Sequence, residues 1–125
     1  YGKFCIYIVR IKLNWTDAAA ACHQLTPEGK LAEPASEDHM LFIRQMTVVE
    51  FRDVGTQTVW IGGVRDNVTN KLVWASSGHV ITTTSWGALQ PNSPSKGENC
   101  VGLEQDAVND VHDFKCGQLK YLLCE

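Results

Sequence analysis

The sequence predicts an α+β fold in which two helices are segregated from an antiparallel sheet. Three observations support this fold class. An apolar run, Phe4–Val9, is rich in β-branched and aromatic residues and predicts a strand buried on both faces. Two segments with helical character follow before Gly55, and several short strand-like segments follow after it. The order is therefore one strand, two helices, and then several strands around a long loop.

The first helix is predicted over Asn14–Gln24, which contains Ala18–Ala21, a run of the strongest helix-forming residue. We expect Thr16 to be its N-cap, with Asp17 in the positively polarised first turn. The segment Thr26–Gly29 has turn chemistry and ends the helix.

The second helix is predicted to begin at Ser36 as N-cap, with acidic residues in its first turn. Met40, Ile43 and Met46 recur at three-residue intervals, and Leu41 flanks them. Such a stripe is typical of a helix face that packs on the core rather than of a cofactor site.

Short strands are predicted after Gly55, at Val59–Gly63, Leu72–Trp74, Cys100–Leu103 and Tyr121–Cys124. The segment 75–99 between them is rich in Ser, Thr, Gly, Pro and Asn and has no helical period. Loops of this length inside a small domain are usually functional or disordered. Trp86 within the segment and Cys100 at its end favour an ordered, functional loop.

Length and charge limit the classes of partner. The chain has 125 residues and a formal net charge of −3, so we expect a single domain over residues 1–125 that does not bind nucleic acid. The longest uncharged stretch, Leu72–Ser95, is too polar to cross a bilayer, and no signal peptide is evident.

Five cysteines in so short a chain indicate an oxidising, extracellular compartment and hence a secreted protein. Two acceptor sequences for N-glycosylation, at Asn14 and Asn67, support secretion as a glycoprotein. A bridge between Cys22 and Cys124 would clamp nearly the whole chain, and Cys100 and Cys116 bracket one hairpin-like segment. The sequence alone permits other connectivities.

Several motifs together resemble the C-type lectin domain, in the expected order and over essentially the whole chain. They are Trp15 before the first helical cysteine, Trp60-Ile61-Gly62-Gly63, Trp74, Trp86, Gln90-Pro91-Asn92, Glu98-Asn99-Cys100-Val101 and Cys116…Cys124-Glu125. The resemblance implies two helices against short antiparallel sheets, pairing of the first and last strands, and a long loop that carries the ligand site. It also implies the disulfides Cys22–Cys124 and Cys100–Cys116.

Cys5 is left without a partner in this frame. Three fates stay open: a partner whose mate lies in a segment absent from this chain, an intermolecular bridge that would make a homodimer, or a buried free thiol. A position in a buried strand favours the free thiol.

The residues of the long loop predict a calcium site. Gln90, Asn92 and Glu98 carry oxygen ligands around a proline, and Ca²⁺ prefers six to eight oxygens from carboxylates, amides and carbonyls. In the family that the chain resembles, an Asn-Asp pair in the following strand completes the site. The resemblance also implies an auxiliary calcium site that would draw on Asp66, Asn70, Ser93, Glu98 and Asn99. Only two of these residues are carboxylates, so we expect this second site to be weak or absent.

Two registers are compatible with that Asn-Asp pair. Counting back from Cys116 selects Val111-His112-Asp113, which supplies Asp113 as ligand but places a histidine, a poor Ca²⁺ ligand, at the Asn position. The other register uses Asn109 and Asp110 and needs a bulge. We favour Asp113, because pairing fixes a strand's register.

The resemblance implies calcium-dependent carbohydrate binding, with two vicinal sugar hydroxyls coordinated directly to the ion, and a role in pathogen recognition. The sugar-binding residues would be Gln90, Asn92, Glu98, His112 and Asp113. Gln-Pro-Asn is a hybrid of the family's mannose-type and galactose-type motifs. The loop lacks the aromatic residue typical of galactose sites, so we expect mannose, fucose or N-acetylglucosamine as ligand.

Alternative functions belong to other classes. No catalytic motif surrounds the four histidines, so we do not expect an enzyme. The main alternative is a calcium-independent C-type lectin-like domain that binds a protein or another non-sugar ligand through the same loop. A third possibility keeps calcium as a purely structural clamp.

Overall fold

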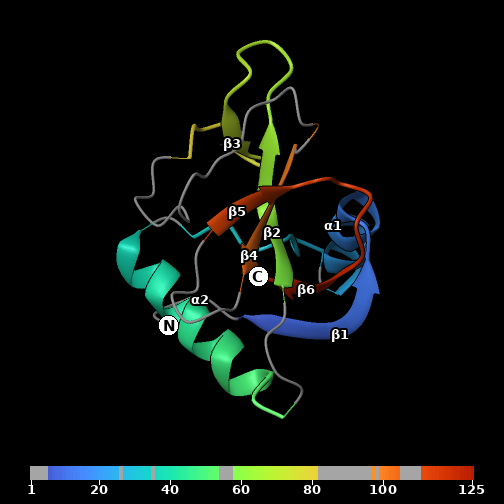
Figure 1. Cartoon of the computed structure of the whole chain (residues 1–125), viewed down its shortest axis with the longest axis vertical. Coiled ribbons are helices and arrows are strands. Elements are labelled where there is room, and N and C mark those ends of the chain that lie inside the picture. Colours follow the sequence, from blue (N-terminus) through green and yellow to red (C-terminus); the bar gives the residue numbers. More distant parts are fainter. Residues whose placement is uncertain are drawn as a thin grey trace.

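The computed structural model describes residues 6–25, 27–34, 36–53, 58–81, 97, 99–104 and 111–125. Cys5 lies outside these residues. The chain forms two helices and six strands within them (Figure 1). In chain order they are β1 (Tyr7–Leu13), α1 (Trp15–Leu25), α2 (Glu37–Glu50), β2 (Thr58–Arg65), β3 (Leu72–Trp74), β4 (Cys100–Glu104), β5 (Val111–Phe114) and β6 (Lys120–Cys124).

All six strands form one sheet in the order β1-β6-β2-β4-β5, and β3 pairs with β2 beside this path. The first and last strands pair antiparallel, as expected, with Tyr7 opposite Cys124. The sheet is mixed, however, because β2 and β6 run parallel, with Val59 opposite Tyr121. The other strand pairs are antiparallel, which agrees with the expected fold class.

The two helices cover opposite sides of the central strands (Figure 1). Alternate residues of β2 point to opposite faces of the sheet. Trp60 therefore packs with Ala18 and Cys22 of α1, whereas Ile61 packs with Ile43 of α2. The predicted core face of α2 is confirmed for Met40 and Ile43, but Leu41 is exposed.

The start of each helix is fixed by a side-chain cap. Ser36 accepts a hydrogen bond from the backbone N–H of His39 and is the predicted N-cap of α2. For α1 the prediction of Thr16 was wrong. The helix begins at Trp15, and Asn14 Oδ1 accepts from the backbone N–H of Asp17 at 2.9 Å. Asn14 and Thr16 are both cap-forming residue types two positions apart, so the sequence signal was ambiguous.

Strand β1 is more exposed than its sequence predicts. Within the predicted strand Phe4–Val9, Tyr7 keeps 46% of its surface exposed and Ile8 and Val9 are only half-buried, so the expectation of a strand buried on both faces was wrong. The reason is its position at an edge of the sheet, where it pairs only with β6.

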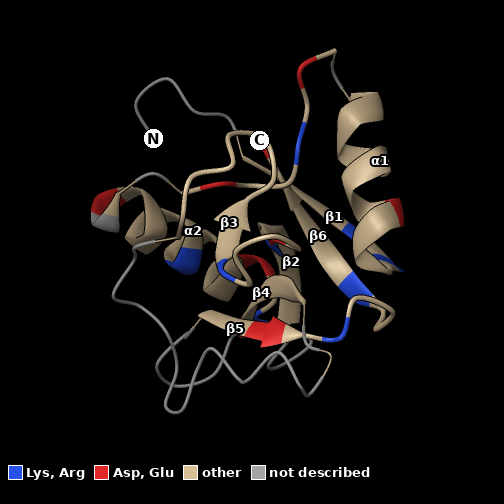
Figure 2. Ribbon diagram, turned by 90° about the horizontal axis from the view of Figure 1, so that it is seen from above, with Lys and Arg blue, Asp and Glu red and all other residues tan. Residues whose placement is uncertain are grey.

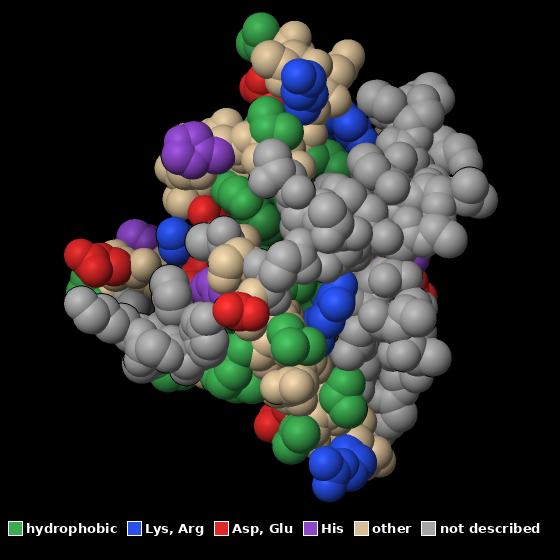
Figure 3. Space-filling model, turned by 90° about the vertical axis from the view of Figure 1, so that its left-hand side faces the viewer, with side chains coloured by type: hydrophobic (Ala, Val, Ile, Leu, Met, Phe, Trp, Pro, Cys, Tyr) green, Lys and Arg blue, Asp and Glu red, His purple; other side chains and the backbone are tan. Residues whose placement is uncertain are grey.

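On the face of the molecule in Figure 3, the hydrophobic side chains drawn in colour form small groups separated by charged ones.

Both implied disulfides are formed. Cys22–Cys124 joins α1 to β6 with a Cα–Cα distance of 5.4 Å, and Cys100–Cys116 joins the start of β4 to the turn after β5 at 5.1 Å. Among the described residues no helix is long and apolar enough to cross a membrane.

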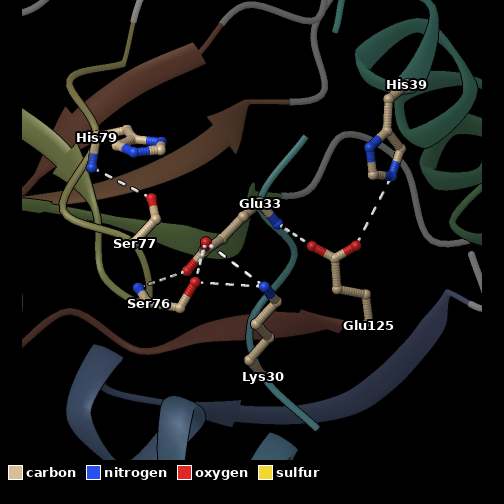
Figure 4. A network of polar contacts seen from close by, with 7 residues as sticks. All are labelled: Lys30, Glu33, His39, Ser76, Ser77, His79 and Glu125. Carbon is tan, nitrogen blue, oxygen red and sulfur yellow. Dashed lines mark hydrogen bonds and ion pairs between the residues drawn. The ribbon is translucent and has the colours of Figure 1, made fainter. Parts of the chain in front are cut away.

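A short segment after α1 ties the C-terminal strand to the centre of the sheet. Ala32 donates to Leu123 O and accepts from the N–H of Gly62, both at 2.8 Å. The next backbone N–H, of Glu33, donates to the carboxylate of Glu125 (Figure 4). Gly62 is required here, because a Cβ at this position would lie 2.7 Å from Glu33 Cγ.

The other Glu125 oxygen faces His39 of α2, with Nε2 and Oε2 3.8 Å apart (Figure 4). His39 is almost fully buried. Burial lowers the pKa of His39, and the negative charge of Glu125 opposes this only in part. Near neutral pH the imidazole is therefore uncharged and forms part of the core.

Candidate functional site

The β4–β5 pair forms the part of the candidate site that the structure describes. Its register places Val101 opposite Asp113 and Gly102 opposite His112. Side chains alternate along β5, so Val111 and Asp113 are buried, whereas His112 and Phe114 are only half-buried. Asp113 is the one acidic residue of β5, which Figure 2 shows in red. The Cys100–Cys116 disulfide holds the ends of both strands together.

Asp113 is paired with an arginine from the central strand. Arg65 Nη2 lies 3.1 Å from Asp113 Oδ2, and the two side chains are 8% and 0% exposed. A buried carboxylate needs a cation and hydrogen bonds to replace water, and a guanidinium supplies both. The residue predicted as an anionic calcium ligand therefore faces a fixed positive charge.

The same guanidinium reaches two further segments. Arg65 Nε donates to Asn99 Oδ1 at 3.1 Å, and Nη1 donates to the carbonyl oxygen of Asn70 at 2.9 Å. The backbone N–H of Arg65 also donates to Asn99 O at 2.8 Å. One side chain of β2 thus joins the β2–β3 turn, the residue before β4, and β5.

His112 lies on the opposite face of β5 from Asp113. Its Nε2 is 3.2 Å from Glu104 Oε2, and its ring stacks on Phe114 with centroids 5.9 Å apart. His112 and Asp113 were both predicted to contact the sugar, but the structure places them on opposite faces of β5. Neighbouring residues of a strand point to opposite sides, which separates them.

The turn between β2 and β3 is held by its own acidic residue. Asp66 Oδ2 accepts from the hydroxyl of Thr69 at 2.7 Å and from its backbone N–H at 3.1 Å. These hydrogen bonds, the one from the hydroxyl above all, lower the pKa of Asp66. Asn70 adopts the left-handed conformation with φ of 61°, which aims its carbonyl at Arg65. Asn67, a predicted glycosylation site, is exposed in this turn.

The side chain at the other predicted glycosylation site is hydrogen-bonded within the protein. Asn14 caps α1 through Oδ1, and its Nδ2 donates to Asp17 Oδ2 at 3.2 Å. Of the two sites, Asn67 therefore has the more accessible side chain.

Most of the predicted calcium and sugar ligands lie outside the described residues, namely Gln90, Asn92, Glu98, Asn109 and Asp110. Within the part of the chain that is described, no three His, Cys, Asp or Glu side chains are placed to hold a metal ion. Of the predicted set only Asp113 can be tested for its fit to calcium. Its arrangement fits a guanidinium rather than an ion that needs a free carboxylate.

A separate cavity of about 240 Å³ lies beside α1, lined by Trp15, Ala19, His23, Gly29, Lys30, Leu31, Glu33, Gly62, Ala75 and Ser76. The Glu33 carboxylate accepts from the hydroxyl and backbone N–H of Ser76 and faces Lys30 (Figure 4). These polar groups of the wall satisfy one another. No residue predicted for the sugar site lines this cavity.

Sequence reasoning missed Arg65 as a site residue. The only signal was a charged residue at the end of the apolar run Thr58–Val64, directly before a turn. That position alone predicts an exposed strand end, because lysine and arginine are rarely buried. The partner of Arg65 is 48 residues away in the sequence and became visible only through the pairing of β2, β4 and β5.

Comparison with known proteins agrees with this architecture. A sequence model of the Lectin C-type domain matches residues 11–125. Lectin BRA-2 of Megabalanus rosa is 28% identical over 121 residues, which cover 97% of this chain and 63% of that protein. The chain thus spans less than two thirds of the length of BRA-2. Lithostathine-2 of Mus musculus is also 28% identical, over 100% of this chain and 70% of that protein.

A solved structure of human lithostathine superposes with a TM-score of 0.84 at 25% identity and covers 99% of this chain and 83% of that one. The matched family model describes a lectin domain, and BRA-2 is a lectin by name. With two helices, a sheet that unites the first and last strands, and two disulfides in the expected places, the chain belongs to the C-type lectin domain family.

Proposed function

We propose that this domain binds carbohydrate in a calcium-dependent manner through the loop between β3 and β4. The observation that supports this most is the Gln90-Pro91-Asn92 motif followed by Glu98, in a C-type lectin domain whose loop ends at the Cys100–Cys116 disulfide. Amide and carboxylate oxygens are the ligands that Ca²⁺ prefers. Bound there, the ion would supply coordination positions for two vicinal hydroxyls of a sugar.

The base of the loop supports a stable site. Asn99 is held by Arg65 through both its backbone and its side chain, and Cys100 is held by its disulfide. Glu98, the one carboxylate among the three loop ligands, directly precedes these two anchored residues. A loop end that is already anchored loses less conformational entropy when the ligand binds.

The ligand class proposed is mannose, fucose or N-acetylglucosamine. After the Gln-Pro-Asn motif the loop has no aromatic residue that could stack on the face of a galactose ring. With amides at both flanking positions, few anionic ligands remain, so we expect weak calcium affinity.

The two disulfides support an extracellular location, since such bonds persist in oxidising compartments. Glycan recognition outside the cell would suit a role in pathogen recognition.

A glycan array probed with calcium and with EDTA tests the proposal. We expect binding to mannose-type glycans in calcium and its loss in EDTA. Binding that survives EDTA would instead favour the calcium-independent alternative, which the pairing of Asp113 with Arg65 supports. An array with no bound glycan in either condition would contradict carbohydrate binding altogether.

A substitution tests the ligand set. Glu98→Gln should lower calcium affinity, measured by calorimetry, because it removes a carboxylate charge and leaves a neutral amide. The urea midpoint in EDTA should stay that of the unmodified domain. The matched control is Glu28→Gln, at an exposed glutamate in the turn after α1. Equal calcium affinity for both variants would remove Glu98 from the site.

A further inference from the structure

Arg65 gathers oxygen atoms from three separate segments of the chain. They are a carboxylate oxygen of Asp113, the amide oxygen of Asn99 and the backbone carbonyl of Asn70, at 2.9 to 3.1 Å from its nitrogens. Carboxylate, amide and carbonyl are also the oxygen types that Ca²⁺ collects. We propose that Arg65 is a built-in cation that takes the place of a metal ion at the base of the ligand loop, with Asp113 as its counter-ion.

Burial makes the exchange of this cation for a metal unfavourable. The Arg65 and Asp113 side chains are 8% and 0% exposed, so their charges interact with little screening by water. A calcium ion bound to Asp113 would lie beside a guanidinium that cannot lose its proton. The two cations would repel each other, and breaking the buried ion pair between Arg65 and Asp113 would destabilise the fold.

The position of Arg65 also explains why an auxiliary calcium ion is not needed. Asn70 and Asn99 belong to the set predicted for that site, and both give their oxygens to Arg65. Asp66, another member of the set, is occupied by Thr69. The guanidinium therefore replaces the auxiliary ion and, unlike an ion, cannot be removed by a chelator.

This assignment has a consequence for the proposed sugar site. The backbone and side chain of Asn99 stay attached to β2 with or without calcium, so the end of the loop is positioned in advance. The calcium ligands would then be Gln90, Asn92 and Glu98, completed by the Asn109–Asp110 register instead of Asp113. This consequence rests on the proposed function, whereas the role of Arg65 does not.

Two substitutions of Arg65 and one control test the inference. Arg65→Met keeps an unbranched side chain and removes the charge. Arg65→Glu brings a carboxylate toward Asp113, and its shorter chain leaves room for an ion with metal–oxygen distances of about 2.4 Å. Arg52→Met is the control, because Arg52 is an exposed arginine in the turn after α2.

The readouts are the melting temperature and amide hydrogen exchange of the β4 and β5 peptides, in calcium and in EDTA, without sugar. In the unmodified domain we expect equal protection of β5 in both conditions. Arg65→Met should lower the melting temperature by roughly 10 °C and accelerate exchange in β5, with no rescue by calcium. Arg65→Glu should show the same loss in EDTA but regain protection in calcium. Arg52→Met should match the unmodified domain.

Three results would overturn the inference. They are protection of β5 in the unmodified domain that disappears in EDTA, an Arg65→Met variant with unchanged exchange in β5, or an Arg65→Glu variant that does not respond to calcium. Because no arm contains sugar, these results stand apart from the glycan array. A domain that binds no glycan would refute the proposed function and leave the role of Arg65 intact.

Discussion

Lys120 in β6 is a buried cation at the centre of an aromatic group. It is 6% exposed, and its Nζ lies 3.8 Å from the Phe114 ring centroid and 5.3 Å from that of Trp60. Nζ also donates to the hydroxyl of Thr58 at 3.1 Å. Burial lowers the pKa of Lys120 to about 8, against the opposing effect of Glu104.

The free energy of unfolding of the domain should therefore change with pH in the alkaline range. Between pH 8 and 10.5 the unfolded chain retains the Lys120 proton more than the folded one does, so the free energy of unfolding rises with pH across this window. The rise due to Lys120 is up to about 3 kcal/mol. In Lys120→Met we expect this rise to vanish, as measured by urea unfolding at pH values of about 7.5 and 10.

The matched control is Lys115→Met, at an exposed lysine just before Cys116. It should keep the rise in stability with pH. If Lys120→Met and Lys115→Met show the same pH dependence, the lowered pKa of Lys120 is refuted.

Residues such as Lys120 and Arg65 show where sequence reasoning stopped. Each is a charged residue beside an apolar run, a pattern that predicts an exposed strand end. Their burial depends on partners from other strands, Phe114 for Lys120 and Asp113 for Arg65. No local pattern contains that information.

At the scale of elements, α1 depends on the cap that Asn14 provides. Asn14→Ala should reduce the free energy of unfolding by about 1 kcal/mol, because the N–H of Asp17 loses its acceptor. Thr16→Ala should have a smaller effect, since Thr16 is an exposed residue of the first helical turn. Both substitutions destroy the same glycosylation sequence, so a glycan cannot explain a difference between them. Chemical unfolding is the measurement, and a greater loss for Thr16→Ala would contradict the cap.

The strands show the same division between local signal and context. The segments that became β2, β3, β4 and β6 were predicted within a few residues of their ends. Whether a strand is buried was predicted less well. The apolar run Phe4–Val9 suggested two covered faces, but a strand at the sheet edge that pairs only with β6 leaves Tyr7 exposed.

At the scale of the whole molecule, the two disulfides constrain very different lengths of chain. Cys22–Cys124 spans 102 residues and Cys100–Cys116 spans 16. In the chain-entropy model they contribute about 4.7 and 3 kcal/mol. Replacing Cys22 and Cys124 by alanine should therefore lower the urea midpoint more than replacing Cys100 and Cys116. A larger loss from the shorter bridge would show that local packing, and not chain entropy, determines the difference.

The sequence by itself determined the α+β class, both helices and most strands, because periodicity and cap residues act within a few positions of each other. Its motif order also indicated the family that the comparison then showed. Only the tertiary structure decided that β2 and β6 run parallel, that His112 and Asp113 face opposite ways, and that Asp113 meets Arg65. These features arise where segments far apart in the chain come together, since strand register there selects which charge meets which.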